Sequence, residues 1–233
     1  MQKERLNIII PIYNPHAGWN EFFVEAVKQL EMELADTQLS VILVNDGSTR
    51  EIKELPGVLE SSKIIRYHSL EKNQGKGFAV RYGVGMEEAD YYCYTDVDFP
   101  FGYEPIVLSY KQLKASGKNL VFGIRERSYY KMLPAEREFI SYLLKWFSMI
   151  ITGFKLRDTQ APMKTMDNRA RQILLSTKTD GFIFDFEFLL HCLGKKISFS
   201  TINIAPRRKI TFTDFRLTFL RKQFIDVIKV FFR

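Results

Sequence analysis

The sequence has few of the residues that build disulfide frameworks or zinc sites. It contains only two cysteines, Cys93 and Cys192, and three histidines in 233 residues. A disulfide-stabilised domain needs several paired cysteines, and a structural zinc site needs Cys or His ligands at short spacings. Neither pattern occurs here. We therefore expect a chain that resides in a reducing cytoplasm and has no histidine-rich metal site.

The sequence also lacks a hydrophobic run long enough to cross a bilayer. A membrane-spanning helix needs about 20 consecutive apolar residues, whereas the most apolar run extends only from Phe139 to Phe154 and contains Lys145. No signal peptide is expected, because Met1 to Arg5 lead directly into a short apolar segment. These features predict a cytoplasmic chain that is not an integral membrane protein.

Positive charge is concentrated near the end of the sequence. The net charge is +7, and residues 207–233 contain eight Lys or Arg against two Asp, a surplus of six. From Phe215 to Phe232, apolar residues recur at helical spacing, with Lys222 and Lys229 on another face. A basic amphipathic helix of this kind suits an anionic membrane interface. The alternatives are packing against the protein's own core or against a second subunit; the single apolar face argues against nucleic acid.

Apolar segments alternate with helical patterns along the first half of the sequence. Runs of mostly apolar, often β-branched residues predict buried strands at residues 6–12, 39–44, 64–67, 91–95 and 120–124. Helices are predicted at 20–34, with Asn20 as the cap, and from about 77 to 89. Further helices are predicted at 135–153, 168–175 and 185–193, followed by a strand at 196–204. This order predicts an α/β domain, a Rossmann-like fold with a mostly parallel central sheet flanked by helices.

We expect this domain to cover residues 1–210. Its first half would span about 1–125 and its second half about 126–210, followed by the basic amphipathic tail at 211–233. Polar clusters follow the predicted strands directly. In open α/β sheets, ligands bind outside the carboxyl ends of the strands. The placement of these clusters therefore predicts an active site.

Asp96 and Asp98 stand two residues apart at a predicted strand end. Two carboxylates placed in this way can share one Mg²⁺ or Mn²⁺, and a hard cation completes its shell with oxygens from water or phosphate. Such a site suits a nucleotide diphosphate. An Asp-x-Asp sequence also occurs by chance in many proteins, so its context matters.

Three further motifs provide that context, at residues 10–14 (Ile-Pro-Ile-Tyr-Asn), 44–48 (Val-Asn-Asp-Gly-Ser) and 73–77 (Asn-Gln-Gly-Lys-Gly). Together with the aspartate pair, and in this order at successive strand ends, they make the sequence resemble glycosyltransferase family 2, the inverting enzymes of GT-A fold. Within the family it resembles the branch of dolichyl-phosphate mannosyltransferases and polyprenyl-phosphate glycosyltransferases. The resemblance extends from about Leu6 to Lys209.

The resemblance implies a nucleotide-binding half at about 1–125 and an acceptor half at about 126–210, and it implies roles for residues on the donor side. The residues expected to bind the nucleotide are Pro11, Tyr13, Asn14, Asp46, Lys76, Asp96 and Val97. In this scheme Asp46 accepts an N–H of the base, and Lys76 lies near the diphosphate between two glycines that let backbone approach. Asp96 and Asp98 hold the metal, and Asp98 belongs to the catalytic residues. A plain turn is the alternative for the two glycines.

The resemblance also implies an acceptor site. Arg137 and Ser141 lie four residues apart, so they share one face of the predicted helix and suit an acceptor phosphate. The residues expected to bind the acceptor are Arg125, Arg137, Ser141, Arg208 and Lys209, and the catalytic residues are Asp98, Asp158 and Arg137. Asp158 is expected near the donor sugar or the acceptor phosphate. Asp185 and Glu187 orient the sugar, unless Asp185 merely caps a helix.

The sequence departs from the family pattern after the first motif, where Pro15 replaces a common Glu, and after the aspartate pair. Pro100 follows there and supplies no side-chain ligand to a metal.

The expected function is inverting transfer of a hexose from a UDP- or GDP-sugar to a polyprenyl phosphate at the cytoplasmic membrane face, in cell envelope glycan biosynthesis. A glycan hydroxyl acceptor is the alternative and requires Asp158, Asp185 or Glu187 as base. The second alternative is a non-catalytic module that binds nucleotide or lipid phosphate.

Overall fold

The computed structural model describes residues 3–207, apart from 134, 154, 157 and 160. In the helix at 135–151, the side chains of residues 135–137, 139, 140, 143, 144 and 147 are not described. The expected acceptor residues Arg208 and Lys209 and the amphipathic tail at 211–233 lie outside the described residues. So does the side chain of Arg137.

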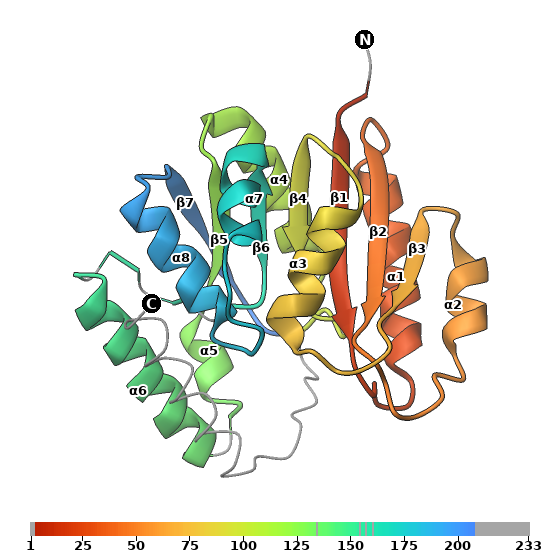
Figure 1. Ribbon diagram of the computed structural model, residues 1–233, viewed down its shortest axis with the longest axis horizontal. Helices are drawn as coiled ribbons and strands as arrows, with labels where there is room; N and C mark the ends of the chain where they lie inside the picture. The colour runs from red at the N-terminus through yellow and green to blue at the C-terminus, as the bar shows by residue number, and fades with distance from the viewer. Residues whose placement is uncertain (1–2, 134, 154, 157, 160, 208–233) are drawn as a thin grey trace.

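The described residues contain one mixed sheet with the strand order β3-β2-β1-β4-β6-β5-β7 (Figure 1). The strands are β1 (Arg5–Ile12), β2 (Gln38–Asn45), β3 (Ile65–Ser69), β4 (Tyr91–Tyr94), β5 (Leu120–Arg125), β6 (Lys164–Asp167) and β7 (Phe199–Ile204). All neighbours are parallel except β6, which runs antiparallel to both β4 and β5. The predicted α/β class and mostly parallel sheet are therefore confirmed.

Helices cover both faces of the sheet (Figure 1). The helices are α1 (Trp19–Glu33), α2 (Leu55–Ser61), α3 (Lys76–Met86), α4 (Glu104–Ser116), α5 (Arg127–Tyr130), α6 (Ala135–Ile151), α7 (Asn168–Leu175) and α8 (Phe184–Gly194). Helices α3, α7 and α8 pack on one face, and α1 and α4 pack on the other. None of the described helices combines the length and the apolar character needed to cross a bilayer.

The side chains of β1 show why this strand lies at the centre. Ile8 and Ile10 join the core beneath α1 and α4, whereas Ile9 joins the core beneath α3 and α8. Alternate residues of a strand face opposite sides, so a strand covered on both faces reads as a continuous apolar run. Pro11 is tolerated because β1 pairs with β4 only as far as Ile9. Beyond that point, the amide that proline lacks has no strand to bond on that side.

Most predicted elements are present, with three differences. Helix α1 begins at Trp19 after Gly18 in a left-handed conformation, with no side-chain cap, so the prediction that Asn20 caps it is wrong. Helices α2, α4 and α5 were not predicted. Strand β6 was also missed, and it joins the two halves of the sheet by pairing with β4 and β5.

Candidate active site

The motif residues gather at the carboxyl edge of the parallel strands, the lower edge in Figure 1. Tyr13 and Asn14 follow β1, Asp46 follows β2 and Asp96 follows β4. Because β6 is antiparallel, its first residue, Lys164, reaches the same edge. The sheet thus brings together polar side chains that are distant in the sequence.

Asn14 connects the loops that follow β1 and β2. Its side-chain oxygen accepts hydrogen bonds from the backbone amides of Thr49 (3.0 Å) and Arg50 (3.1 Å). The backbone amide of Asn14 donates to the hydroxyl oxygen of Ser48 at 2.9 Å. Asn14 has a φ of 44°, in the left-handed region that asparagine tolerates better than most residues. Beside it, Tyr13 leaves 46% of its surface exposed, which makes its ring available to a ligand.

Asp46 holds the loop that contains Lys76. Its two carboxylate oxygens accept the backbone amides of Gln74 and Gly75, each at 2.8 Å. The side chain is buried, and this burial raises the pKa of Asp46 although both amide hydrogen bonds oppose the shift. Each oxygen keeps a lone pair that can accept an N–H of a nucleobase. This contact, which the family resemblance implies for Asp46, stays a prediction.

Lys76 is the first residue of α3 and points its ammonium group at the aspartate pair. Its Nζ lies 2.5 Å from Oδ1 of Asp96. Burial favours the neutral amine, but the nearby carboxylates of Asp96, Asp185 and Asp98 outweigh it and raise the pKa of Lys76. Lys76 is therefore a fixed cation beside the predicted metal and diphosphate site.

Asp98, the second member of the aspartate pair, is partly buried. Burial and the neighbouring charge of Asp96 raise its pKa to about 6, against the opposing effect of Lys76 and Arg207. Two carboxylates that repel each other in this way are stabilised by a cation placed between them. Among the described residues, no group of three or more His, Cys, Asp or Glu surrounds a metal position. The pair therefore fits a cation that completes its shell with ligand and water oxygens.

Arg207 fixes the backbone of the segment that carries Asp98. Its guanidinium donates to the carbonyl oxygens of Asp98 (2.5 Å) and Phe99 (2.8 Å), and its amide donates to that of Pro100 at 2.9 Å. The guanidinium also lies 3.2 Å from the centroid of the Phe22 ring. Phe99 has a φ of 42°, a conformation that phenylalanine rarely adopts. These contacts hold the segment in this shape.

Asp158 and Arg125 form a buried ion pair. The carboxylate accepts Nε and Nη2 of Arg125, both at 2.8 Å, and also its backbone amide at 3.0 Å. Burial alone would raise the pKa of Asp158, but the charge and hydrogen bonds of Arg125 outweigh it and lower the pKa. The guanidinium lies 4.9 Å from the ring centroid of Tyr129 and 5.6 Å from that of Tyr130. Asp158 thus orients Arg125, whose Nη1 takes no part in this pair.

Asp185 sits in a second buried polar group. Its Oδ1 accepts the hydroxyl of Tyr94 at 2.6 Å and lies 2.5 Å from Nζ of Lys164, which is fully buried. Lys164 also donates to the carbonyl oxygen of Ala161 at 2.7 Å. Burial lowers the pKa of Lys164, and the charge of Asp185 offsets this only in part. The carboxylate of Asp185 is therefore engaged inside the protein.

Glu187 is also engaged. Its carboxylate accepts the backbone amides of Lys178 (3.0 Å) and Thr179 (2.8 Å), and only 4% of the residue is exposed. The sequence placed Asp158, Asp185 and Glu187 in one region but gave no sign that each carboxylate would be occupied. It also gave no role to Lys164, and it treated Arg207 only as part of a basic cluster.

Two of the expected acceptor residues, Arg125 and Ser141, have side chains that the structure describes. Arg125 lies at the end of β5, and Ser141 lies half-buried on α6.

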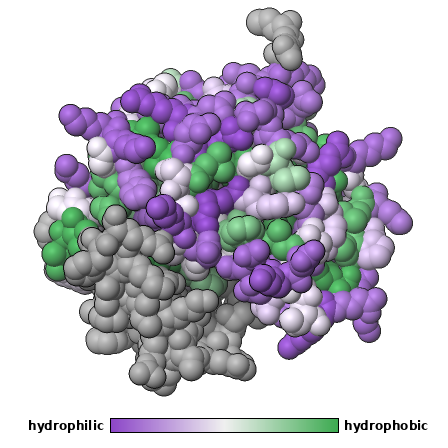
Figure 2. Space-filling view, in the orientation of Figure 1, coloured by the Kyte–Doolittle hydropathy of each residue, from purple (hydrophilic) through white to green (hydrophobic). Residues whose placement is uncertain are grey.

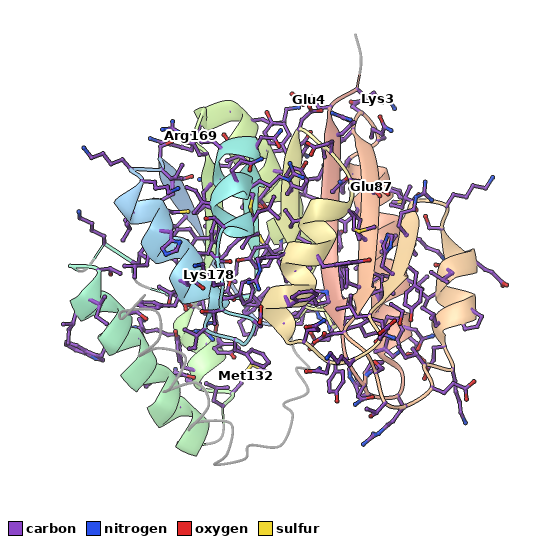
Figure 3. All side chains as sticks on the ribbon, viewed as in Figure 1. Lys3, Glu4, Glu87, Met132, Arg169 and Lys178 are labelled. Atoms are coloured by element: carbon purple, nitrogen blue, oxygen red, sulfur yellow. The ribbon has the colours of Figure 1, made fainter. Side chains whose placement is uncertain are left out.

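A shallow hollow of ≈ 540 Å³ lies at the opposite edge of the sheet, lined by residues that include Arg5, Asp90 and Arg169. Figure 3 labels Arg169 at this upper edge, and Figure 2 shows that the surface there is largely hydrophilic. None of the predicted site residues lines this hollow.

Comparison with known proteins identifies relatives over most of this chain. The family model described as "Glycosyl transferase family 2" matches residues 7–176. A dolichyl-phosphate β-glucosyltransferase of Drosophila melanogaster is 26% identical over 215 residues, which cover 85% of this chain and 66% of the fly protein. The protein of the same name from Saccharomyces cerevisiae is 26% identical over 221 residues, with 86% and 66% covered. This chain thus spans just under two thirds of the length of these relatives.

A solved structure supports the fold. Glucosyl-3-phosphoglycerate synthase from Mycobacterium tuberculosis, in complex with Mn²⁺, UDP and glucosyl-3-phosphoglycerate, superposes with a TM-score of 0.70 at 16% identity. The superposition covers 98% of this chain and 78% of the mycobacterial chain. At this identity the likeness extends to the architecture of the sheet and its helices.

Proposed function

The chain belongs to glycosyltransferase family 2, and we propose that it transfers a hexose from a nucleotide-sugar to a polyprenyl phosphate with inversion at the anomeric carbon. Its sheet and helices form the GT-A fold. The dolichyl-phosphate β-glucosyltransferases among its relatives support a lipid-phosphate acceptor.

The donor binds across the carboxyl ends of β1, β2 and β4. The exposed ring of Tyr13 and the loops joined by Asn14 receive the nucleoside. Pro11 and Asp46 lie next to its nucleobase. Val97 lines the same edge between the two aspartates, and Lys76 approaches the diphosphate from the start of α3. A mycobacterial protein of the same fold binds UDP with Mn²⁺ or Mg²⁺, which supports a nucleotide at this edge.

Asp96 and Asp98 would hold the divalent cation, Mg²⁺ or Mn²⁺. When bound, the cation neutralises negative charge that develops on the departing nucleoside diphosphate. Lys76 contributes a second positive charge to the same leaving group. Pro100 supplies no ligand, and Arg207 holds the backbone on which Asp98 stands.

The observation that carries the acceptor proposal is the occupation of three carboxylates. A hydroxyl acceptor requires a base that removes its proton. Asp158 is bound to Arg125, Asp185 to Tyr94 and Lys164, and Glu187 to two backbone amides. Each of the three is at most 4% exposed. A phosphate monoester acceptor needs no such base, because its oxygen is already anionic near neutral pH.

The residues on the acceptor side then act by holding a phosphate. Arg125 is oriented by Asp158 and keeps Nη1 for an anionic ligand. Arg137 and Ser141 on α6, with Arg208 and Lys209, complete the proposed phosphate site. The acceptor oxygen attacks the anomeric carbon in line with the bond to the diphosphate. Asp158 therefore acts through Arg125 and does not take up a proton.

A polyprenyl acceptor places the enzyme at a membrane. We propose that the basic amphipathic segment at 211–233 contacts the anionic cytoplasmic face of that membrane. Contact of this kind would bring the isoprenoid phosphate to the carboxyl edge of the sheet. It would leave the protein peripheral, in a pathway that builds cell envelope glycans.

The experiment is transfer from labelled UDP- and GDP-sugars into undecaprenyl or dolichyl phosphate, with Mn²⁺ or with EDTA. We expect label in the lipid only with metal, and a loss of transfer in Arg125→Ala and Arg137→Ala. Arg169→Ala, at the opposite edge of the sheet, serves as the matched control. Donor turnover without label in the lipid would instead favour a glycan acceptor. Binding of nucleotide without any turnover would favour a non-catalytic module.

A further inference from the structure

Glu187 lies near the start of α8, and its carboxylate organises the segment that precedes this helix. Oε1 accepts the amide of Lys178 at 3.0 Å, and Oε2 accepts that of Thr179 at 2.8 Å and that of Lys178 at 3.2 Å. Burial alone would raise the pKa of Glu187, but hydrogen bonding to the Thr179 side chain and to these two amides outweighs it and lowers the pKa, so the carboxylate is charged at neutral pH. Lys178 lies on this segment between α7 and α8 (Figure 3).

The same segment supports the first turn of α3, where Lys76 stands. The carbonyl oxygen of Asp180 accepts the amide of Gly77 at 2.7 Å, and that of Thr179 accepts Nη1 of Arg81 at 2.7 Å. Arg81 also pairs with the carboxylate of Asp180. Residues 179 and 180 are thus joined to α3 at two points, one turn apart.

The glycines around Lys76 show how close this contact is. A Cβ on Gly75 would lie 2.4 Å from the carbonyl oxygen of Asp180, and one on Gly77 would lie 2.5 Å from that of Thr179. Real Cβ atoms do not approach so closely, so any side chain at either position would push the two segments apart. Gly75 also has a φ of 111°, which side chains disfavour. In this structure the glycines accommodate residues 179–180, whereas the sequence motif implied an approach to phosphate.

The residues directly before α3 are also held from the other side by Asp46, whose carboxylate accepts the amides of Gln74 and Gly75. Lys76 therefore stands between two buried carboxylates, Asp46 at the end of β2 and Glu187 on α8. The ammonium group of Lys76 pairs with Asp96, whereas Asp46 and Glu187 fix the backbone that carries it.

We propose that Glu187 is a positioning residue for Lys76: through residues 178–180 it fixes the first turn of α3 and so places the lysine ammonium where the donor diphosphate binds. The proposal rests on the proposed function for the role of Lys76. It replaces an orientation of the sugar by Glu187, because both of its carboxylate oxygens are bound to the backbone. A donor site in which the lysine ammonium group is already in place loses less conformational entropy when the donor binds.

The first test needs no activity. Amide hydrogen exchange is measured on the full chain for wild type and Glu187→Gln, with Glu71→Gln as an exposed charge control near the same loop. Glutamine keeps one acceptor oxygen, which at the Oε2 position still accepts both amides, but it presents an NH₂ in place of Oε1, so the 3.0 Å hydrogen bond from Lys178 is lost. We expect exchange at Gln74, Gly75 and Gly77 to rise on the order of tenfold. Exchange in β1 and in the control should not change.

Faster exchange at Lys178 and Thr179 alone, with residues 74–77 unchanged, would overturn the proposal, since Glu187 would then order only its own segment. Arg81→Gln provides a second variant that leaves Glu187 intact, in case Glu187→Gln does not fold. It removes the bonds from α3 to Thr179 and Asp180 and is expected to raise exchange at Gly77 by a similar factor. Unchanged exchange there would also count against the proposal.

The second test measures binding of UDP or GDP, whichever the wild type binds, by calorimetry with Mn²⁺ present. We expect Glu187→Gln to weaken the nucleoside diphosphate about fivefold and, in transfer assays, to raise KM for the donor while KM for the lipid phosphate is unchanged. A rise confined to the acceptor KM would overturn the positioning role. If wild type transfers no sugar, the proposed function fails, whereas the exchange result still decides the role of Glu187.

Discussion

The ammonium nitrogen of Lys76 lies 2.5 Å from Oδ1 of Asp96, so a cation of the protein itself occupies one carboxylate of the proposed metal site. Lys76 is anchored at the start of α3, and only 14% of its side chain is exposed. Asp96 thus has a partner without metal, whereas burial and the neighbouring charge of Asp96 raise the pKa of Asp98. A divalent cation that binds both aspartates must compete with this lysine. A diphosphate would relieve the competition by offering the lysine oxygens of its own.

This competition predicts opposite effects of one substitution. In Lys76→Met, Mn²⁺ should bind more tightly in the absence of nucleotide, by up to about fivefold, because a partly exposed ion pair is worth up to about 1 kcal/mol. With Mn²⁺ present, the nucleoside diphosphate should bind about tenfold or more weakly, because a charged hydrogen bond worth about 1.5–3 kcal/mol is lost. Calorimetry with Mn²⁺ alone and with UDP or GDP measures both. Lys72→Met, in the exposed part of the same loop, is the control and should change neither.

The contacts of Arg207 predict a second effect on metal binding. Arg207→Lys keeps the positive charge but cannot bond the carbonyl oxygens of Asp98 and Phe99 at once with a planar fork. The segment that carries Asp98 should then be less ordered, and Mn²⁺ affinity should fall by about threefold to tenfold. Titration of Mn²⁺ by electron paramagnetic resonance gives this affinity without an assay of transfer. Arg169→Lys at the opposite edge should leave it unchanged, and equal affinities in the two variants would contradict the prediction.

Strands β2 and β5 could be predicted from the sequence because most of their residues are buried. Residues 39–44, which are apolar except for Ser40, lie inside β2, and residues 120–124, which are apolar except for Gly123, lie inside β5. Strand β6 could not be recognised in this way, since it has four residues and begins with Lys164, a lysine that is fully buried. Helix α4 did carry a signal that was not used. Pro105 stands in its first turn, and its buried apolar residues recur at helical spacing.

For the candidate site, the sequence located the strand ends but not the pairs of side chains. Asp96 and Lys76 could be assigned to one edge because both follow strands of the parallel part of the sheet. The pairing of Asp158 with Arg125 depends on β6 running antiparallel beside β5, which no local pattern indicated. The role of Glu187 depends on two backbone amides, and backbone groups leave no trace in a sequence motif. The roles of the individual residues in binding and catalysis stay predictions.

The two cysteines predict inert thiols in the folded protein. Both are buried, and burial raises the pKa of the Cys93 and Cys192 thiols to about 12 each. The thiolate is the reactive form, so both should resist a disulfide reagent such as Ellman's reagent at pH 8. We expect two thiols to be counted in guanidinium chloride and fewer than one in buffer over the same period. Rapid reaction of a thiol in buffer would show that the core around β4 or α8 opens readily.

The ion pair of Asp158 and Arg125 predicts a stability difference that depends on pH. Asp158→Asn leaves the Arg125 guanidinium buried without a counter-charge, which typically costs about 3–5 kcal/mol in the free energy of unfolding near pH 7. Because the pKa of Asp158 is lowered by folding, its contribution is present above the unfolded value near 4 and is lost as the pH falls through the folded value. The difference between wild type and variant should therefore narrow as the pH is lowered from 6 toward 3. Urea unfolding at each pH measures it, and Asp90→Asn, which breaks the exposed pair with Arg5, should cost less than about 1 kcal/mol. A difference that stays constant over this range would mean that Asp158 is not held as a carboxylate by Arg125.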